Sequence, residues 1–140
     1  APEQSEREHE QLLAIEEQIY QKLGLAYQVV NVCAGDLGAP AYKKYDLEAW
    51  MPGKGPKGGY GEITSASNCT DYQARRLNIR YKDSQDGINR FVHTLNGTAI
   101  ALSRTILAIL EHYQTANGSV IMPEVLAPWL PFRQITPQGK

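Results

Sequence analysis

The sequence has few residues suited to metal or disulfide chemistry. Its only cysteines are Cys33 and Cys69, which cannot build a disulfide framework, and no third thiol supports a structural zinc site. The three histidines have no metal-like spacing with one another or with the cysteines. No apolar run reaches about 18 residues, and no signal peptide opens the chain. We therefore expect a soluble protein of a reducing compartment, the cytoplasm, with no membrane contact.

The charges are balanced overall but unevenly distributed. Lys and Arg total 14 and Asp and Glu total 15, so no global basic field indicates nucleic acid. Between residues 39 and 90, however, nine basic residues stand against six acidic ones, whereas the first 17 residues hold six Glu and one Arg. An anionic ligand would prefer the middle of the chain. No G-x-G-x-x-G sequence or P-loop occurs, so a nucleotide would have to bind without these glycine cradles.

The pattern of apolar residues predicts about one domain with more strands than helices. Two amphipathic helices are expected, over residues 5–25 and 99–114, with a short helical turn at 71–75. The expected strands span residues 26–33, 44–51, 60–67, 76–81 and 90–96. Most connections between them are too short for a parallel crossover. We therefore expect an α+β fold, an antiparallel sheet flanked by helices.

The helix boundaries and buried faces can also be predicted. Ser5 and Glu8 have the spacing of a capping box, and Gly24 supplies a stop. The stripe expected to face the core on the first helix is Leu12, Ile15, Ile19 and Leu23. The corresponding stripe on the second is Leu102, Ile106, Ile109 and Tyr113.

Arg104 lies off the apolar stripe, at the start of the second helix. Gly97, Ala99 and Ala101 precede it and leave room for a ligand to approach the backbone, while a helix start offers free N–H groups and the positive end of the dipole. Together with a guanidinium, these features suit a phosphate. The alternative is an exposed arginine on a solvated helix face.

A second group of polar residues is equally open to two interpretations. Glu62 and Thr64 fall on one face of a regular strand and Ile63 and Ser65 on the other, unless the strand bulges. A carboxylate beside a hydroxyl suits Mg²⁺, but it also suits an ordinary half-exposed strand.

Asn96 and Thr98 could recognise a small polar ligand, or they could be turn residues that bond their own backbone. Arg75 and Arg76 are expected to pair with Asp71, and Lys54 and Lys57 lie in a cationic loop that is solvated by default.

Four segments of the sequence, in their order and spacing, resemble the C-terminal half of the catalytic domain of seryl-tRNA synthetases. They are "GDLGAPAYKKYDLEAWMP", "GEITSASNCTDYQARRLNIRY", "HTLNGTAIALSRTILAILEHYQ" and "GSVIMPEVL". The likeness extends from about residue 5 to residue 129, and "TLNGTAIALSR" resembles motif 3 of class II synthetases. The resemblance implies the class II antiparallel sheet. It also implies that residues 1–140 form a single partial domain, from which motifs 1 and 2 are absent.

The resemblance further implies a function and a set of site residues. The family activates L-serine with ATP to seryl-adenylate and transfers it to tRNA(Ser) as a homodimer. Carried over by position, Glu62, Ile63, Thr64 and Ser65 match the ATP-binding stretch, with Glu62 and Ser65 contacting Mg²⁺. Asn96 and Thr98 match the serine-binding positions, and Arg104 matches the catalytic, ATP-binding arginine of motif 3. With half of the site missing, we expect little or no activity from the chain alone.

The sequence departs from the family at one point near the predicted metal contact. Gly61 stands where the family commonly has arginine, and the Gly- and Lys-rich loop at 53–59 precedes it, so Lys54 or Lys57 could replace the lost contact. Two alternatives remain open. One is a non-catalytic binding or regulatory module derived from a synthetase, and the other is an amino acid:carrier-protein ligase of the same core.

Overall fold

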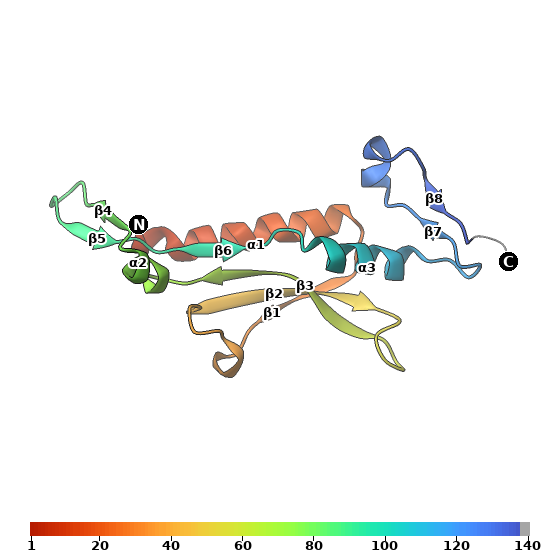
Figure 1. Ribbon diagram of the computed structural model, residues 1–140, viewed down its shortest axis with the longest axis horizontal. Helices are drawn as coiled ribbons and strands as arrows, with labels where there is room; N and C mark the ends of the chain where they lie inside the picture. The colour runs from red at the N-terminus through yellow and green to blue at the C-terminus, as the bar shows by residue number, and fades with distance from the viewer. Residues whose placement is uncertain (138–140) are drawn as a thin grey trace.

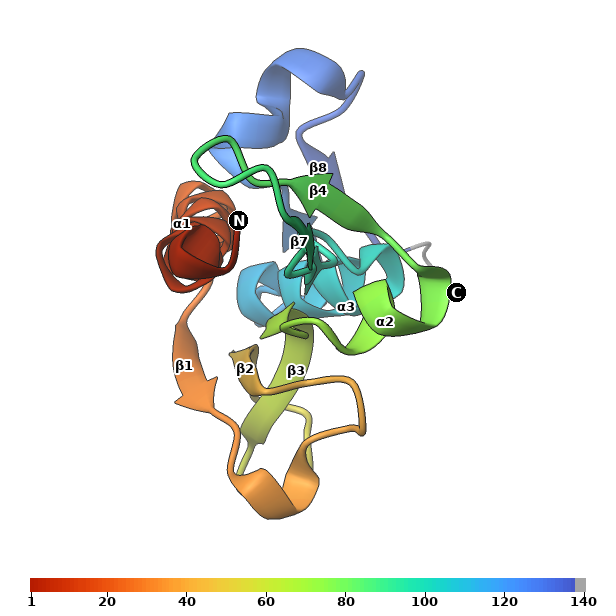
Figure 2. The ribbon, with the colours of Figure 1, turned by 90° about the vertical axis from the view of Figure 1, so that its left-hand side faces the viewer.

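A four-stranded antiparallel sheet covered on one side by two helices forms the body of the molecule. The computed structural model describes residues 1–137. The strand order is β1-β2-β3-β6, and the strands span Tyr27–Asn31, Lys43–Met51, Gly59–Asn68 and Leu95–Gly97. Helices α1 (Ser5–Lys22) and α3 (Leu102–Tyr113) lie on the same side of this sheet (Figures 1 and 2). The expected α+β fold with an antiparallel sheet is confirmed.

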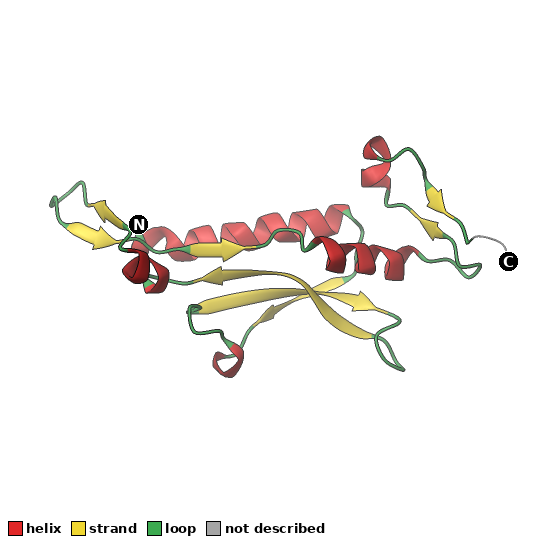
Figure 3. Ribbon diagram, viewed as in Figure 1, coloured by secondary structure: helices red, strands yellow, loops and turns green. Residues whose placement is uncertain are grey.

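Smaller elements lie at the two ends of this body (Figure 3). The end near the N-terminus carries α2 (Tyr72–Leu77) and a two-stranded sheet of β4 (Arg80–Lys82) and β5 (Asn89–Phe91). The other end carries a two-stranded sheet of β7 (Val120–Ile121) and β8 (Gln134–Ile135). Short 3₁₀ helices complete the described chain, at η1 (Pro2–Gln4), η2 (Ala34–Asp36) and η3 (Glu124–Trp129). No helix of residues 1–137 combines the length and the apolar character that crossing a bilayer requires.

Two predicted strands are wrong in extent. The strand expected at 76–81 is only three residues long, because α2 continues to Leu77 and Asn78 ends it in the left-handed conformation, with φ 53°. The strand expected at 90–96 is divided between two sheets, with β5 pairing to β4 and β6 pairing to β3. Between them the Thr94 amide donates to the Thr70 carbonyl at 2.9 Å, which bends the chain away from the first sheet.

The buried face of α1 differs from the predicted stripe. His9, Leu13, Glu16 and Tyr20 are buried, whereas Ile15 is 45% exposed. Polar side chains on this face form hydrogen bonds with partners on the sheet side. His9 Nε2, for example, lies 2.9 Å from the carbonyl oxygen of Ala66. The predicted capping box is also wrong, since α1 begins at Ser5, whose hydroxyl donates to the Pro2 carbonyl. Gly24, with φ +67°, follows the end of the helix as expected.

The buried face of α3 also differs from the predicted stripe. Thr105, Ala108 and Ile109 are buried, but Leu102 is 72% and Ile106 is 55% exposed. The small side chains face the sheet, where the helix packs closely against β2 and β3. Leu102 and Ile106 instead line an apolar groove of about 350 Å³ between α3, the end of α1 and η3, and no segment of residues 1–137 fills it.

Candidate active site on the open face of the sheet

A bulge in β3 determines which predicted site residues share a face. Leu47 of β2 pairs with Thr64, but the next residue, Glu48, pairs with Glu62, so Ile63 is an extra residue in β3. Ile63 and Thr64 are both buried, 0% and 1% exposed, which places both side chains on the side covered by the helices. The regular alternation that paired Glu62 with Thr64 is therefore wrong.

The same register brings Glu62 and Ser65 onto one face. Glu62 lies opposite Glu48 and Ser65 lies opposite Asp46, and residues 46 and 48 share a face because strand side chains alternate. Asn96 of β6 lies opposite Ser67, two residues beyond Ser65, and thus joins this face. We call this side of the sheet, which α1 and α3 do not cover, the open face.

The buried pair within the predicted ATP-binding stretch has a different role from its neighbours. Ile63 belongs to the core cluster with Leu47, and Thr64 lies on the same covered side. Any contact that these two positions make with a nucleotide has to use their backbone. The side chains of Glu62 and Ser65 are half-buried and remain accessible on the open face.

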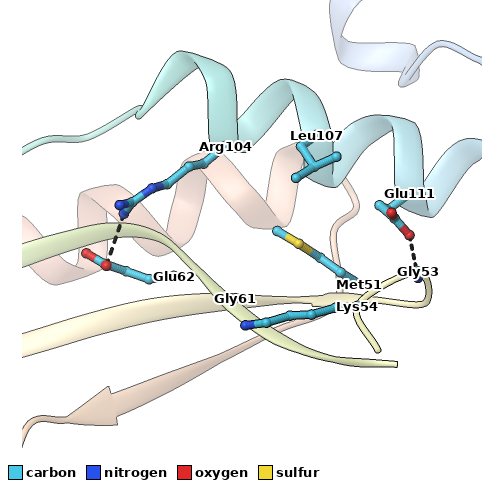
Figure 4. A pocket seen from close by; sticks show the side chains of 8 residues that line it. All are labelled: Met51, Gly53, Lys54, Gly61, Glu62, Arg104, Leu107 and Glu111. Atoms are coloured by element: carbon cyan, nitrogen blue, oxygen red, sulfur yellow. Dashed lines mark hydrogen bonds and ion pairs between the residues drawn. The ribbon is translucent and has the colours of Figure 1, made fainter. Parts of the chain in front are cut away.

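Arg104 extends from the first turn of α3 toward Glu62, as Figure 4 shows. Its Nη1 lies 3.0 Å from Glu62 Oε2, and the two side chains are 51% and 35% exposed. The path is open because β6 pairs only with the last part of β3, from Ala66 to Asn68. An ion pair this exposed is weak, so either partner can exchange it for a ligand at little cost.

The ion pair borders a cavity of about 460 Å³ between β3, the β2–β3 turn and α3. Besides Glu62 and Arg104, the cavity is lined by Met51, Gly53, Lys54, Gly61, Leu107 and Glu111 (Figure 4). The Glu111 carboxylate accepts a hydrogen bond from the Gly53 amide at 2.7 Å and so fixes the turn against α3.

Lys54 lies beside Gly61, the position at which the resemblance implies an arginine in the family. Its Nζ donates to the carbonyl of Tyr60 and lies 3.4 Å from the position that a Cβ at Gly61 would take. Lys57 does not line the cavity. Of the two loop lysines, Lys54 is therefore the one placed beside Glu62.

Asn96 and Thr98 do not line this cavity, but both lie beside β3. Both are exposed, and the Thr98 amide donates to the Ser65 carbonyl at 3.3 Å. That bond places Thr98 next to one end of the Glu62–Ser65 stretch. Of the seven predicted site residues, all but Ile63 and Thr64 thus have side chains on or beside the open face: Glu62, Ser65, Asn96, Thr98 and Arg104.

The two arginines of α2 have partners within the chain, whereas the two cysteines form no disulfide. Arg75 pairs with Asp71 at 2.6 Å, as expected, but Arg76 instead lies over the ring of Tyr72. Both cysteines are free, with Cys33 exposed and Cys69 buried. Within residues 1–137, no three His, Cys, Asp or Glu side chains gather in a way that could hold a metal ion by themselves.

The sequence analysis missed two residues of α1 that contact the backbone next to the site, from the covered side of the sheet. Glu16 and Tyr20 are 2% and 0% exposed, and both bond the backbone of Ala99, directly after Thr98. A signal for them existed in the 3- and 4-residue spacing of His9, Leu13, Glu16 and Tyr20. We did not predict this face because we chose the stripe by its aliphatic residues, which placed the acidic and aromatic residues on the solvent side of α1.

Comparison with known proteins shows the family to which the chain belongs. The family described as tRNA synthetase class II core domain (G, H, P, S and T) matches residues 1–113. The serine–tRNA ligase of Treponema denticola is 61% identical over 134 residues, which are 96% of this chain and 31% of that protein. The ligase of Dictyoglomus thermophilum is 56% identical over 137 residues, or 98% of this chain and 31% of its own length.

Solved structures give the same result. The seryl-tRNA synthetase of Pyrococcus horikoshii, complexed with ATP, superposes with a TM-score of 0.94 at 52% identity, over 99% of this chain and 30% of the other. The cytoplasmic serine–tRNA ligase of Naegleria fowleri, in complex with AMP, gives 0.85 at 43% identity, over 97% and 32%. The chain spans about 31% of the length of the curated relatives that it matches. It belongs to the class II tRNA synthetase core-domain family and is homologous, over that part of their length, to serine–tRNA ligases.

Proposed function

We propose that residues 1–140 are a partial catalytic domain that supplies one side of a serine-activating site. The parent reaction joins L-serine to ATP as seryl-adenylate and then transfers the seryl group to tRNA(Ser). The observation that carries the proposal is the Arg104–Glu62 ion pair on the open face, beside Ser65 and Asn96. An exposed guanidinium that can leave its carboxylate is available to a phosphate.

Adenylate formation requires positioning and charge neutralisation more than a catalytic base. A serine carboxylate oxygen attacks the α-phosphorus of ATP, the bond from that phosphorus to the bridging oxygen breaks, and pyrophosphate leaves with the electron pair. Negative charge accumulates on the phosphoryl oxygens during this step. Arg104 stabilises that charge from the start of α3, and Lys54 lines the same cavity from the β2–β3 turn.

The residues on the open face fit a magnesium ion that is shared with a nucleotide. The bulge puts the Glu62 carboxylate and the Ser65 hydroxyl on one face, and Mg²⁺ prefers one or two such oxygen ligands together with phosphates and waters. Glu62 and Ser65 would hold the ion, and its chemistry there is to neutralise phosphate charge.

Asn96 and Thr98 recognise the substrate serine in this proposal. Both are exposed, and an amide together with a hydroxyl can bond the serine hydroxyl. Alanine lacks that hydroxyl and would leave both groups without a partner, which makes the site selective.

The rest of the parent site, its homodimer contact and its tRNA-binding parts belong to the two thirds of the relatives' length that this chain does not span. A cytoplasmic location agrees with the relative from Naegleria fowleri.

A non-catalytic module is the second candidate, favoured by the exposed apolar side chains of Leu102 and Ile106, which suit a protein partner. Asn96 and Thr98 count against the carrier-protein ligase, because a changed serine site would be expected there.

Serine-dependent exchange of label between pyrophosphate and ATP tests the proposal. The assay compares this chain alone with the chain mixed with the non-overlapping part of the Treponema denticola ligase, and alanine replaces serine as the control. We expect little exchange from the chain alone and serine-dependent exchange from the mixture. No exchange in either case, with no ATP binding, contradicts a catalytic role and leaves the binding module.

A further inference from the structure

The backbone between β6 and α3 passes through a strained residue. Ala99 has φ 55°, in the left-handed region, which is unfavourable for a residue with a Cβ. Such a conformation persists only where its surroundings hold it. The segment connects Thr98 on one side to the helix that carries Arg104 on the other.

Two side chains of α1 hold the backbone groups of this residue. The Ala99 amide donates to Glu16 Oε1 at 3.3 Å, and the Ala99 carbonyl accepts from the Tyr20 hydroxyl at 3.1 Å. Glu16 and Tyr20 are four residues apart and so lie on one face of the helix, one turn from each other. Both polar groups of Ala99 are thereby bonded to a single rigid element.

The hydroxyl of Tyr20 also reaches α3. It lies 3.3 Å from the hydroxyl oxygen of Thr105, the residue directly after Arg104. A displacement of Tyr20 would consequently affect both ends of the connection, Ala99 and the first turn of α3.

Burying the carboxylate of Glu16 at this position costs folding free energy. It is 2% exposed, its Oε2 has no hydrogen-bond partner, and no cation of residues 1–137 forms an ion pair with it. Burial raises the pKa of the Glu16 carboxyl, and the hydrogen bond from Ala99 offsets part of that rise. An aliphatic side chain would avoid these costs. The contact with Ala99 is the one interaction that requires an oxygen at this place.

The carboxyl also packs directly against the turn. A Cβ built on Gly97 would lie 3.0 Å from Glu16 Oε1, so the glycine and the carboxyl fit each other closely. Glu16 therefore constrains Gly97 and Ala99, the two neighbours of Thr98.

We propose that Glu16 and Tyr20 are positioning residues, which hold the turn at residues 97–99 so that Thr98 and Arg104 face the ligand. Their bonds to Ala99 set the direction in which the Thr98 hydroxyl points and the place at which α3 begins. The role of Thr98 in serine recognition rests on the proposed function; the clamp on Ala99 does not.

Amide hydrogen exchange, measured by NMR on the 140-residue chain, tests the clamp without any activity. Glu16→Ala should accelerate exchange of the Ala99 amide about tenfold, the effect of losing one hydrogen bond. Glu16→Gln, which keeps an oxygen acceptor, should restore most of the protection. The control is Glu17→Ala, because Glu17 accepts from Tyr27 and does not contact the turn. Unchanged Ala99 exchange in a folded Glu16→Ala chain overturns the proposal.

Tyr20→Phe provides a second test if Glu16→Ala does not fold. Phenylalanine keeps the buried ring and removes only the hydroxyl, so the carbonyl carbon resonance of Ala99 should shift as it loses its donor. A resonance that stays in place means that Tyr20 does not hold Ala99, which also overturns the proposal.

The kinetic consequence is measured in the mixture with the Treponema denticola part. Glu16→Ala should raise the serine KM about tenfold with a smaller change in kcat, and Glu16→Gln should reverse most of that rise. If the unmodified mixture shows no exchange, the proposed function fails while the NMR result still decides the clamp. An unchanged serine KM in a chain whose Ala99 amide has become unprotected overturns the positioning role.

Discussion

The two faces of β3 differ in burial, charge and purpose. On the covered face, Ile63 and Thr64 are 0% and 1% exposed and pack beneath α1 and α3. On the open face, Glu62 and Ser65 are half-buried, and Glu62 pairs with a partly exposed arginine. One bulge produces this division, because it places two successive residues on the covered side and returns the next to the open side.

The division separates stability from chemistry within four residues of sequence. Side chains of the covered face remove apolar surface from water, which is the main source of folding free energy. Those of the open face contribute little to folding, and their contacts can be exchanged for a ligand. Substitutions on the two faces should therefore fail in different assays.

Arg104→Ala should give the largest effect. Removing a preorganised charge beside the reacting phosphate costs about 100- to 1,000-fold in rate in comparable sites, or about 3–4 kcal/mol. We expect that loss in serine-dependent pyrophosphate exchange by the mixture described above, with the melting temperature of the chain nearly unchanged, because the pair with Glu62 is exposed.

Arg76→Ala is the matched control for Arg104→Ala. Arg76 is an exposed arginine that lies over Tyr72, far along the chain from the cavity. Its replacement should leave the exchange rate within about twofold, since surface substitutions seldom change more than local contacts. Equal rates for the two variants would remove Arg104 from the site.

Ile63→Ala should show the opposite pattern. The side chain is fully buried, and truncation of a buried isoleucine costs about 2–5 kcal/mol of unfolding free energy. Denaturant unfolding of the chain measures the loss. Leu102→Ala, at a residue that is 72% exposed, should cost no more than about 0.5 kcal/mol. A similar cost for both variants would show that the groove beside Leu102 is covered in solution.

Local pattern was sufficient to predict the fold class and most elements. Period-2 alternation located β2 and β3, and the helical period located α1 and α3, because these signals depend only on neighbours in sequence. The bulge could not be predicted, since both registers satisfy the sequence and only pairing with β2 decides between them. The family resemblance nevertheless paired Glu62 with Ser65, which regular alternation alone would have separated.

The helix faces show a second limit of local pattern. Leu102 and Ile106 are apolar, and an isolated helix gives no reason to leave them exposed. Among residues 1–137 they line an apolar groove that no other segment fills, which the helical period of the sequence does not predict. Glu16 shows the reverse case, a charged residue that is buried because a distant backbone amide needs an acceptor.

Thr98→Ala should have an intermediate effect, confined to substrate choice. Loss of the hydroxyl should reduce kcat/KM for serine about tenfold, with the preference for serine over alanine reduced by the same factor, the effect of one lost polar contact. Exchange assays with each amino acid in the mixture measure both values. Thr115→Ala, at a half-buried threonine after α3 that does not line the cavity, is the control, and equal preferences in the two variants would contradict a serine-binding role for Thr98.

Glu16→Gln should produce the smallest effect, and one that depends on pH. Burial raises the pKa of the Glu16 carboxyl above its usual 4.5, so the folded chain takes up a proton at a higher pH than the unfolded chain does. Glu16 therefore destabilises the fold at neutral pH, and this cost disappears as the pH falls through the raised pKa. Glutamine carries no such proton and keeps the acceptor for Ala99. The variant should melt at a higher temperature than the parent near pH 7, with the difference shrinking toward pH 4.5. A difference that stays constant, or grows as the pH falls, would show that the carboxyl is more hydrated than its burial indicates.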